Sequence, residues 1–542
     1  MDNRTRKIVI WLPVLLVIAI TAGVFLGIKL QNRKQVNTRT MFVNAANKVG
    51  MIMNLIERNY VDTVSPKKLV EAAIPEILKQ LDPHTVYIPA KDMQEVSEEM
   101  SGNFSGIGVQ FSIQNDTIMV IDVISGGPSQ KLGIRAGDRI VRVNDSIMAG
   151  VKVTNEKVLK KLRGEKGTHV KVGIARKGFG EIIAFDITRG EIPLNSIDVT
   201  YMINSNTGYI KVGRFAEKTY DEFMSGLDKL DKAGAKQLII DLRANPGGYL
   251  TAVIKMVSEF LNVGELVVYT EGRTQPKRTF SAEAKGTYFG KDVVILVDEY
   301  SASASEIFAG AIQDNDRGTI IGRRTFGKGL VQEQIPFYDG SAMRLTVARY
   351  YTPSGRCIQK SYKNGLDDYY GDLKRRYAHG ELEQKDSIHY TDTQKYYTRN
   401  KRVVYGGGGI MPDIFIAADT SGMSPYYSKV VLKGLVYQYA FDFSDKNRAE
   451  LGQLKTGKEF ESYLLGHNIL RLFTEYADKQ GVITNPKDLA ISGKIIETQL
   501  MAYIARNIIG EVGFYSVISN IDATLLEAIK ALDTKNKLVK SN

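Results

Sequence analysis

Three serines that alternate along one short segment, YSASASEI, are the first candidates for chemistry: Ser301, Ser303 and Ser305. An apolar, strand-like run precedes them and a helical pattern follows, which predicts a strand-to-helix junction. Such a junction exposes a side chain beside a helix N-terminus, where developing negative charge is favoured. Serines at a helix start are more often simple caps, so a nucleophilic serine needs a base as a second signal.

Lys328 is the candidate base. The chain has no G-x-S-x-G nucleophile elbow and no histidine in a turn pattern near these serines. A lysine can serve if burial lowers its pKa from about 10.4 toward neutrality. Lys328 is flanked by glycines and then by apolar residues in FGKGL, which suits that demand. The S-x-x-K pattern of penicillin-binding enzymes is absent, because Glu306 stands three residues after Ser303.

The segment around this lysine also begins like a nucleotide-binding P-loop, G-x-x-x-x-G-K, from Gly322 to Lys328. Two details argue against that interpretation. Gly329 stands where a P-loop needs a serine or threonine for magnesium, and residues 330–336 alternate like a strand, whereas a phosphate site needs a helix. We therefore expect no nucleotide site and no cofactor.

The elements that position these residues follow an α/β pattern between residues 191 and 360. Apolar strands are predicted at 237–242, 293–297 and 319–322, with helices to about Leu261 and about Asp314 after the first two. Residues 362–405 are rich in tyrosine and charge, which predicts an irregular surface insertion. Residues 424–535 are amphipathic and predict helices with a packing or association role.

Residues 41–97 predict two helices, the second running from Lys67 to Leu81 and ending at the turn signal Asp82-Pro83-His84-Thr85. Residues 98–190 change to glycines and five alternating strands, GIGVQFSI, TIMVIDVI, DRIVRVND, HVKVGIAR and IIAFDITRG. With the run G-x-x-A-G-D-x-I-x-x-V-N from Gly133 to Asn144, this layout resembles a PDZ domain.

The resemblance extends to a carboxylate-binding loop, in which backbone N–H groups point at the C-terminus of a peptide. The four residues that match this loop are Gly106, Ile107, Gly108 and Val109. The two glycines would allow close approach of a carboxylate. A tight turn without a ligand is the alternative, and the PDZ-like frame favours peptide binding.

Taken together, the ordered motifs resemble the carboxyl-terminal processing proteases, or tail-specific proteases, over about residues 45–415. These are serine endopeptidases with an inserted PDZ domain and a Ser–Lys dyad. Besides the PDZ signature, the matching motifs are Asp82-Pro83-His84-Thr85, Asp241-Leu242-Arg243-x-Asn245-Pro246-Gly247-Gly248, Ser301-Ala302-Ser303-Ala304-Ser305-Glu306, Gly327-Lys328-Gly329-x-x-Gln332, Tyr351-Thr352-Pro353-x-Gly355 and Pro412-Asp413-Ile414.

The resemblance implies roles for single residues. The family's lysine follows its serine by 25 residues, which assigns Ser303 as the nucleophile of Lys328. Gln332 would orient the lysine amine, from the same strand face as Lys328 and Leu330. The oxyanion hole would combine the N–H of Ala304 with one from Gly247 or Gly248. The residues expected to be structural are Ser301, Ser305, Glu306 and His84, while Arg243 is expected to pair with a carboxylate.

The implied fold is an α/β catalytic core like that of crotonase and Clp protease subunits, with the PDZ domain inserted and helical regions on either side. We expect an anchor and juxtamembrane linker at 1–40, a helical N-terminal region at 41–97, the PDZ domain at 98–190, the protease core at 191–420 and a helical C-terminal region at 421–542. The insertion at 362–405 belongs to the core.

The composition argues against several further functions and sites. The chain has 542 residues, a net charge of +12, 43% hydrophobic and 24% charged residues, which suits three or four globular domains. The basic residues form no long run, which argues against nucleic-acid binding. The single cysteine, Cys357, and five histidines without metal-ligand spacing predict no disulfide and no metal site.

Ile8 to Ile28 is a stretch of 21 residues without a charge, long enough to span a membrane as a helix. Three basic residues precede it and four follow, so flanking charge does not set its orientation. A cleaved signal peptide ending near Ile20-Thr21-Ala22 is the alternative. Anchored members of the family imply a single-pass anchor in the cytoplasmic membrane, with the catalytic part in the periplasm or otherwise outside the cytoplasm.

Two functional hypotheses remain at this point. One is an active, membrane-anchored endopeptidase that recognises the free C-termini of protein substrates and cuts near them. The other is a catalytically inactive scaffold that binds tails through its PDZ domain. Intact Ser303, Lys328 and Gln332 favour the first. An adaptor protein and a homo-oligomer, the latter through the helical region, are further hypotheses about partners.

Overall fold

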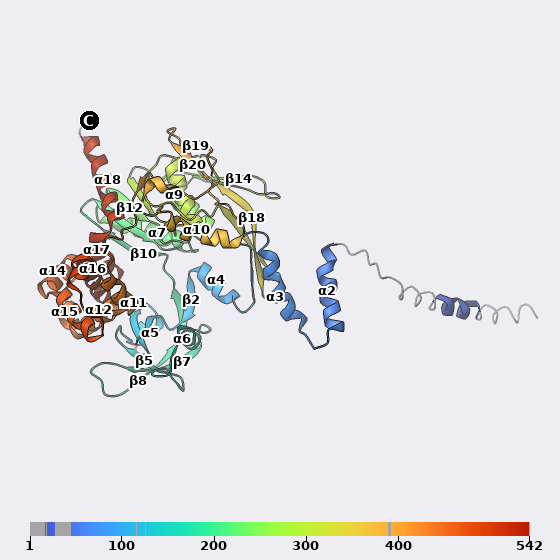
Figure 1. Ribbon diagram of the computed structural model, residues 1–542, viewed down its shortest axis with the longest axis horizontal. Coiled ribbons are helices and arrows are strands. Elements are labelled where there is room, and N and C mark those ends of the chain that lie inside the picture. The colour runs from blue at the N-terminus through green and yellow to red at the C-terminus, as the bar shows by residue number, and fades with distance from the viewer. Residues whose placement is uncertain are drawn as a thin grey trace, which may run out of the picture. The chain divides into compact units, whose positions relative to one another are not determined.

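The computed structural model of the protein describes residues 17, 19–27, 45–114, 116–124, 126–388 and 392–540 (Figure 1). The chain forms two compact units that divide between Ile77 and Leu78. The first unit holds α2 (Ala45–Asn59) and most of α3 (Pro66–Leu78). The helix α3 begins as predicted after Ser65, with proline in its first turn, but it ends at Leu78, three residues before the predicted end.

Within the part of the chain that the structure describes, no helix combines the length and apolar character needed to cross a membrane. Residues 8–16, 18 and 28 of the expected anchor lie outside the described residues.

A six-stranded sheet forms the centre of the second unit. Its order is β10-β11-β12-β15-β16-β21, and all neighbours pair in parallel except β10 and β11. Three of its strands are the apolar runs predicted from sequence, and β12 is buried along its whole length, as expected of a parallel sheet covered on both faces. The strands are β10 (Ile197–Met202), β11 (Thr207–Val212), β12 (Gln237–Asp241), β15 (Asp292–Val297), β16 (Thr319–Gly322) and β21 (Ile414–Phe415).

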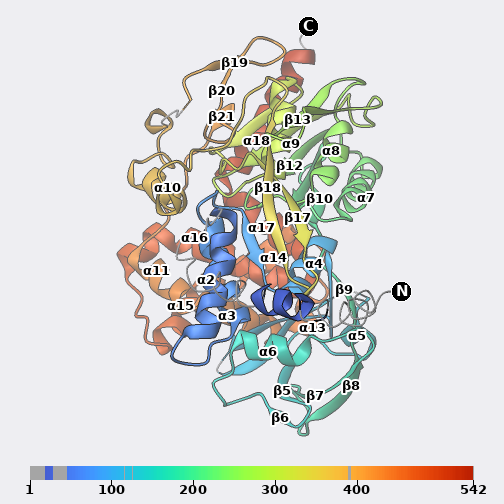
Figure 2. The same ribbon diagram turned by 90° about the vertical axis from the view of Figure 1, so that its right-hand side faces the viewer.

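Helices cover both faces of this sheet (Figure 1 and Figure 2). On one face, α7 (Thr219–Lys232), α8 (Leu250–Ser258) and α9 (Ala304–Asp314) form the main core. On the other face, α18 (Ala523–Lys540) packs against the strands through its apolar side chains; the residues of α18 in this second core are Leu525, Ala528 and Leu532. The C-terminal region therefore supplies part of the core that covers the six-stranded sheet.

A second sheet lies beside the first and brings an N-terminal segment to the core. The short strand β1 (Val86–Ile88), which the sequence did not predict, pairs with β18 (Ala342–Tyr351), and so does β17 (Leu330–Pro336). The sheet also contains β13 (Leu266–Glu271) and β14 (Arg278–Ser281). Pairing of β1 with β18 places the preceding Asp82–Thr85 turn next to the segment that carries Lys328.

The five strands predicted for the PDZ domain are present in one sheet of order β3-β4-β5-β7-β8, with β6 beside β5. The strand β3 is at the edge of this order. The elements of this region are α4 (Met93–Ser101), β2 (Asn103–Gly106), β3 (Val109–Gln114), β4 (Thr117–Val123), α5 (Pro128–Lys131), β5 (Arg139–Val143), β6 (Ser146–Ile147), α6 (Asn155–Leu162), β7 (His169–Ala175), β8 (Ile183–Thr188) and β9 (Gly190–Pro193). The strands β2 and β9 pair with each other, so the PDZ fold is inserted at the end of a two-stranded ribbon.

The insertion at 362–405 is not irregular, and this prediction was wrong. It contains α10 (Leu366–Ala378), the 3-10 helix η1 (Lys385–Ser387) and a hairpin of β19 (Lys395–Tyr397) and β20 (Val403–Tyr405). Acidic residues in the first turn of α10 and basic residues in the last turn complement the helix dipole. Because Tyr369 rather than an aliphatic residue is the buried apolar contact, the hydrophobic pattern gave no helical signal.

The predicted helices of the C-terminal region are confirmed. They are α11 (Pro425–Leu432), α12 (Leu435–Lys446), α13 (Arg448–Leu451), α14 (Gly457–Gly466), α15 (Ile469–Lys479), α16 (Pro486–Ile509), α17 (Glu511–Ile518) and η2 (Ser519–Ile521), which precede α18. They enclose a core of their own around Phe460 and Phe473. The helix α12 also contacts the PDZ fold, where Lys177 Nζ lies 3.4 Å from Asp445 Oδ2.

Candidate active site

The junction between β15 and α9 distinguishes one serine from the other two. Ser301 and Ser305 are fully buried, and their hydroxyls donate to the carbonyl oxygens of Leu242 at 2.8 Å and Asn245 at 3.0 Å. Ser303 is only half-buried. It stands at the N-cap of α9 with φ 55° and ψ −112°, a conformation that a residue with a side chain adopts only under strain. Of the three serines, Ser303 is the one that is not fully buried, and its hydroxyl donates no hydrogen bond to another of the described residues.

The predicted base lies beside its predicted partner. Lys328 Nζ donates to Gln332 Oε1 over 3.1 Å. Burial lowers the pKa of the half-buried Lys328, and the nearby positive charge of Arg344 lowers it further, against the opposing effects of Glu306 and Asp82. Among the described residues, the structure has no hydrogen bond between Lys328 and the Ser303 hydroxyl. Catalytic hydrogen bonds are often long or unformed before substrate binds and tighten in the complex.

Lys328 and Gln332 do not lie on one face of a regular strand, contrary to the prediction. The strand β17 begins at Leu330, so Lys328 precedes it, and the register with β18 shifts between Val331 and Gln332. The simple alternation of one strand face therefore does not hold. The two side chains nevertheless meet, through the hydrogen bond between Lys328 Nζ and Gln332 Oε1.

A buried carboxylate joins the serine and lysine segments. Glu306 accepts hydrogen bonds from the backbone N–H of Ser303 and of Lys328, both at 2.8 Å. It also accepts from the N–H of Gly327 at 2.7 Å and from the Thr325 hydroxyl at 2.6 Å. Burial raises the pKa of Glu306 to about 7, while these donors favour its ionised form. Glu306 therefore fixes the backbone of Ser303 relative to that of Lys328.

Glu306→Ala is expected to lower both the melting temperature and kcat, because two buried and two partly buried donors would lose their acceptor. Each unpaired buried donor costs about 1–3 kcal/mol. The matched control is Glu299→Ala, which removes another buried carboxylate, paired with Arg323 at 2.7 Å. The control should lower the melting temperature and leave kcat nearly unchanged. Thermal unfolding and steady-state kinetics test this, and unchanged kcat in Glu306→Ala would contradict it.

The glycine-rich loop after β12 packs directly on the serine. A Cβ on Gly247 would lie 2.7 Å from Ser303 Cβ, and one on Gly248 would lie 2.0 Å from the carbonyl oxygen of Phe215. The N–H of Gly247 donates to Asn245 Oδ1 at 2.9 Å. By contrast, the N–H groups of Gly248 and Ala304 have no acceptor among the described residues. Two free backbone donors thus remain near Ser303.

Arg243, at the start of this loop, makes the internal ion pair that the sequence suggested, and a second pair that it did not. Its guanidinium lies 2.6 Å from Asp241 Oδ2 and 2.7 Å from Asp522 Oδ2. Although burial alone would raise it, Arg243 and Lys211 hold the pKa of the Asp241 carboxyl well below its ordinary range. Because Asp522 immediately precedes α18, the C-terminal region contacts the base of the catalytic loop.

The Asp82–Thr85 turn belongs to the site, which the sequence did not predict. Gln332 Nε2 donates to the carbonyl oxygen of His84. Asp82 holds the turn by accepting from the N–H groups of His84 and Thr85 at 2.8 and 2.9 Å, and from the hydroxyl of Thr346 at 3.1 Å. Burial, with Lys328 nearby, lowers the pKa of His84 to about 4, so its ring is neutral. In the sequence, the one signal for the contact between Gln332 and His84 is the Asp82-Pro83-His84-Thr85 motif.

The predicted carboxylate-binding loop joins β2 to β3. Gly108 has φ 77°, and a Cβ there would lie 3.0 Å from Ile192 Cδ1. Ile107 is buried in the core of the PDZ fold, while Val109 and Phe111 are half-buried beside it. The loop thus precedes an edge strand with partly exposed apolar side chains, to which a peptide could add by strand pairing.

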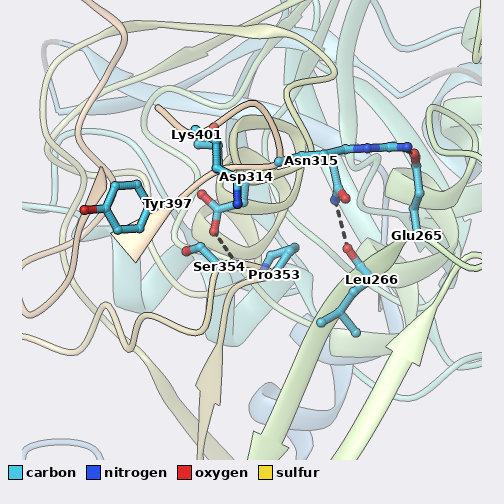
Figure 3. Close-up of a pocket in the computed structure, with 10 residues that line it drawn as sticks. Glu265, Leu266, Asp314, Asn315, Pro353, Ser354, Tyr397 and Lys401 are labelled. Carbon is cyan, nitrogen blue, oxygen red and sulfur yellow. Dashed lines mark hydrogen bonds and ion pairs between the residues drawn. The ribbon is translucent and has the colours of Figure 1, made fainter. Parts of the chain in front are cut away.

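The residues that the structure describes contain no cluster of three metal-ligating side chains. A pocket of about 320 Å³ lies near Asp314, Ser354 and Tyr397, and none of its lining residues belongs to the candidate active site (Figure 3). Burial raises the pKa of the Cys357 thiol, which agrees with an unreactive, half-buried cysteine.

Comparison with protein families assigns most of these regions. Residues 206–367 match peptidase family S41, residues 105–184 match the PDZ domain, and residues 21–92 match the N-terminal domain of the activating protease CtpB. Residues 426–510 match a family of unknown function.

Among similar proteins, the carboxy-terminal-processing protease of Bartonella bacilliformis is 36% identical over 351 residues, which cover 63% of this chain and 80% of that one. CtpB of Bacillus subtilis, a carboxy-terminal processing protease, is 33% identical over 352 residues, 62% of this chain and 72% of the relative. The solved structure of a photosystem II D1 C-terminal processing protease has 25% identity and a TM-score of 0.35, and the match covers 69% of this chain and 94% of that one.

Proposed function

Since the chain belongs to peptidase family S41, as a serine endopeptidase of the carboxy-terminal processing type, we propose that Ser303 and Lys328 form its catalytic dyad. The observation that carries the proposal is the position of Glu306, which binds the backbone N–H of both residues. The half-buried hydroxyl of Ser303 and the lowered pKa of Lys328 support it.

In the proposed reaction, the neutral amine of Lys328 takes the proton of Ser303 Oγ as this oxygen attacks the carbonyl carbon of the scissile peptide bond. The lysine ammonium then gives that proton to the departing amine, which leaves an acyl-enzyme on Ser303. Water attacks the acyl group in the second half, again with Lys328 accepting and returning the proton. Gln332 accepts one N–H of the amine and so leaves the nitrogen lone pair for the serine.

The proposed oxyanion hole consists of the N–H groups of Ala304 and Gly248. Ala304 follows Ser303 in the chain, Gly248 follows Gly247, which packs on Ser303, and neither N–H has an acceptor among the described residues. Gly247 is the weaker candidate because its N–H already donates to Asn245. Donors that are preorganised toward the developing negative charge are a large source of catalysis.

An active-site serine probe tests the dyad directly. A fluorophosphonate should label the wild-type protein at a single residue, Ser303, identified by peptide mass spectrometry. Ser303→Ala should not be labelled, whereas Ser301→Ala and Ser305→Ala should be. Labelling at either of the other serines would show that the nucleophile has been misassigned, and a folded wild-type protein that reacts with no serine would favour the inactive scaffold.

The PDZ fold recognises the substrate in this proposal, through the free carboxylate of its C-terminus. The backbone of residues 106–109 would bind the carboxylate, and Val109 and Phe111 would contact the last side chain. An apolar last residue should be preferred, because burying it contributes about 1.5–3 kcal/mol.

A substrate ending in a carboxylate is therefore expected to be cut markedly faster than the same peptide ending in an amide. The structure supplies a matched control: Gly106 and Gly190 are cross-strand partners, so a short turn can replace residues 107–189 without disturbing β2 and β9. This deletion should make the two peptides equivalent. Equal kcat/KM for acid and amide in the intact protein would show that the PDZ fold does not recognise chain ends.

We also propose that residues 8–28 anchor the protein in the cytoplasmic membrane, with the protease outside the cytoplasm. The support is the 21-residue uncharged stretch and its basic flanks. The full chain should stay in the membrane fraction after alkaline extraction, and a chain starting at residue 41 should be soluble. N-terminal sequencing of the full chain would detect cleavage near Ala22, which would replace the anchor by a signal peptide.

A further inference from the structure

The helix α10 of the insertion lies directly against the candidate active site. Tyr369 is 1% exposed, and its hydroxyl is 2.8 Å from Nε2 of His84. Its ring also packs edge-on against Phe326, two residues before Lys328. The neighbouring Tyr370 donates its hydroxyl to the carbonyl oxygen of Pro83 at 2.8 Å. Two consecutive tyrosines thus hold the Asp82–Thr85 turn, Tyr369 through the ring of His84 and Tyr370 through the backbone carbonyl of Pro83.

The ammonium group of Lys360 strengthens the contact between α10 and Phe326. Lys360 Nζ lies 3.9 Å from the ring centre of Phe326 and 4.4 Å from that of Tyr369. The same amine is 3.1 Å from Asp372 Oδ2, one turn further along α10. The ion pair and the two aromatic contacts fix α10 against the segment that leads to Lys328.

The Asp82–Thr85 turn, held by α10, fixes the orientation of the Gln332 amide. A glutamine side chain has a carbonyl oxygen on one side and an NH₂ group on the other. The carbonyl oxygen of His84 can only accept, so Gln332 must present its NH₂ group there and its oxygen to Lys328. If the amide turned over, its NH₂ group would face Lys328 and compete for the lone pair that the serine proton requires.

We propose that Tyr369 and Tyr370 are positioning residues of the protease: they hold the carbonyl of His84 where it fixes the Gln332 amide, and so keep Lys328 able to act as a base. The inference rests on the proposed dyad. It assigns a catalytic purpose to a tyrosine-rich insertion that contributes no reacting group itself.

The test is the double variant Tyr369→Phe/Tyr370→Phe, which removes both hydroxyls and keeps both rings. The control is Tyr377→Phe on the same helix, where the side chain is 61% exposed, close to the 62% of Tyr370. The double variant should lower kcat about tenfold with KM unchanged, which corresponds to about the free energy of one hydrogen bond that holds the turn. Tyr377→Phe should match the wild type.

To test whether the two tyrosines act through Gln332, the double substitution is repeated in a Gln332→Ala background. The rate at which a fluorophosphonate labels Ser303 is the second readout. There, loss of the two hydroxyls should change either rate by less than about twofold, because coupled residues are not additive. An equal loss in both backgrounds, a raised KM with unchanged kcat, or unchanged kinetics would overturn the proposal.

A crystal structure of the double variant provides a readout that does not depend on activity. It should show the contact between the Gln332 side chain and the His84 carbonyl broken or rearranged, and an unchanged contact would overturn the proposal. Failure of the dyad itself would be recognised separately, as a wild-type protein that hydrolyses no more peptide than Ser303→Ala.

Discussion

Ser303→Ala is expected to abolish peptide hydrolysis, by about a millionfold in kcat, while the protein stays folded. A serine protease loses about this much when its nucleophile is removed. Folding should be unaffected because alanine keeps the Cβ, so the strained backbone at φ 55° is no worse than before, and the side chain is only half-buried. Steady-state kinetics and thermal unfolding measure the two effects.

The neighbouring serines are the controls for this variant. Ser305→Ala removes one hydrogen bond to a loop carbonyl, which costs about 0.5–1.5 kcal/mol of stability. Ser301→Ala removes the bond to the Leu242 carbonyl and also the acceptor of the Asp298 N–H at 2.9 Å, so it should cost more stability. They should retain most of the activity. Normal turnover by Ser303→Ala, or complete loss in one of the other two with a normal fold, would refute the assignment.

Lys328→Arg is expected to be inactive although it keeps a positive charge and a long side chain. The proposed base must be neutral, and a guanidinium cannot lose its proton at any working pH. The wild-type rate should rise with pH along one limb, set by a lysine whose pKa is lowered from its ordinary value by burial. The only described histidine against the dyad, His84, has a pKa of about 4 and should not contribute a limb near neutrality.

The lowered pKa of Lys328 also leads to a prediction about the stability of the protein. Because the folded state releases the Lys328 proton at a lower pH than the unfolded chain, the unfolded state binds more protons between the two pKa values. The contribution of Lys328 to the free energy of unfolding therefore rises as pH rises from the folded pKa to the unfolded pKa. This stabilisation is lost again as pH falls through the folded pKa. Denaturant unfolding of wild type and Lys328→Met at several pH values isolates this contribution of Lys328 to the free energy of unfolding.

For catalysis, a wild-type rate that is already flat from pH 6, together with an active Lys328→Arg variant, would exclude the lysine base.

The sequence predicted what depends on local pattern or on a resemblance carried by short motifs. The strands that lead to the serine segment are long apolar runs, and the five PDZ strands alternate, so hydrophobic periodicity finds both. Ser303 and Lys328 lie in motifs with a fixed spacing. The assignment of Ser301 and Ser305 as structural agrees with their buried hydroxyls.

What the sequence missed depends on contacts between distant segments. Gln332 meets His84 across 248 positions, and His84 meets Tyr369 across 285. The strand β1 has only three residues, too few for a pattern to register, yet it brings the turn into place. The helix α10 buries a tyrosine and an arginine, and a search for aliphatic residues at helical spacing passes over such a helix.

The helix α18 sets the order in which this protease can become complete during synthesis. A chain grows from its N-terminus, so the serine, the lysine and the PDZ fold all emerge before Leu525, Ala528 and Leu532 cover the second face of the catalytic sheet. Asp522, which neutralises Arg243 below the glycine loop, emerges just ahead of them. We therefore expect the catalytic sheet to be covered on both faces only after the C-terminal helices have been made.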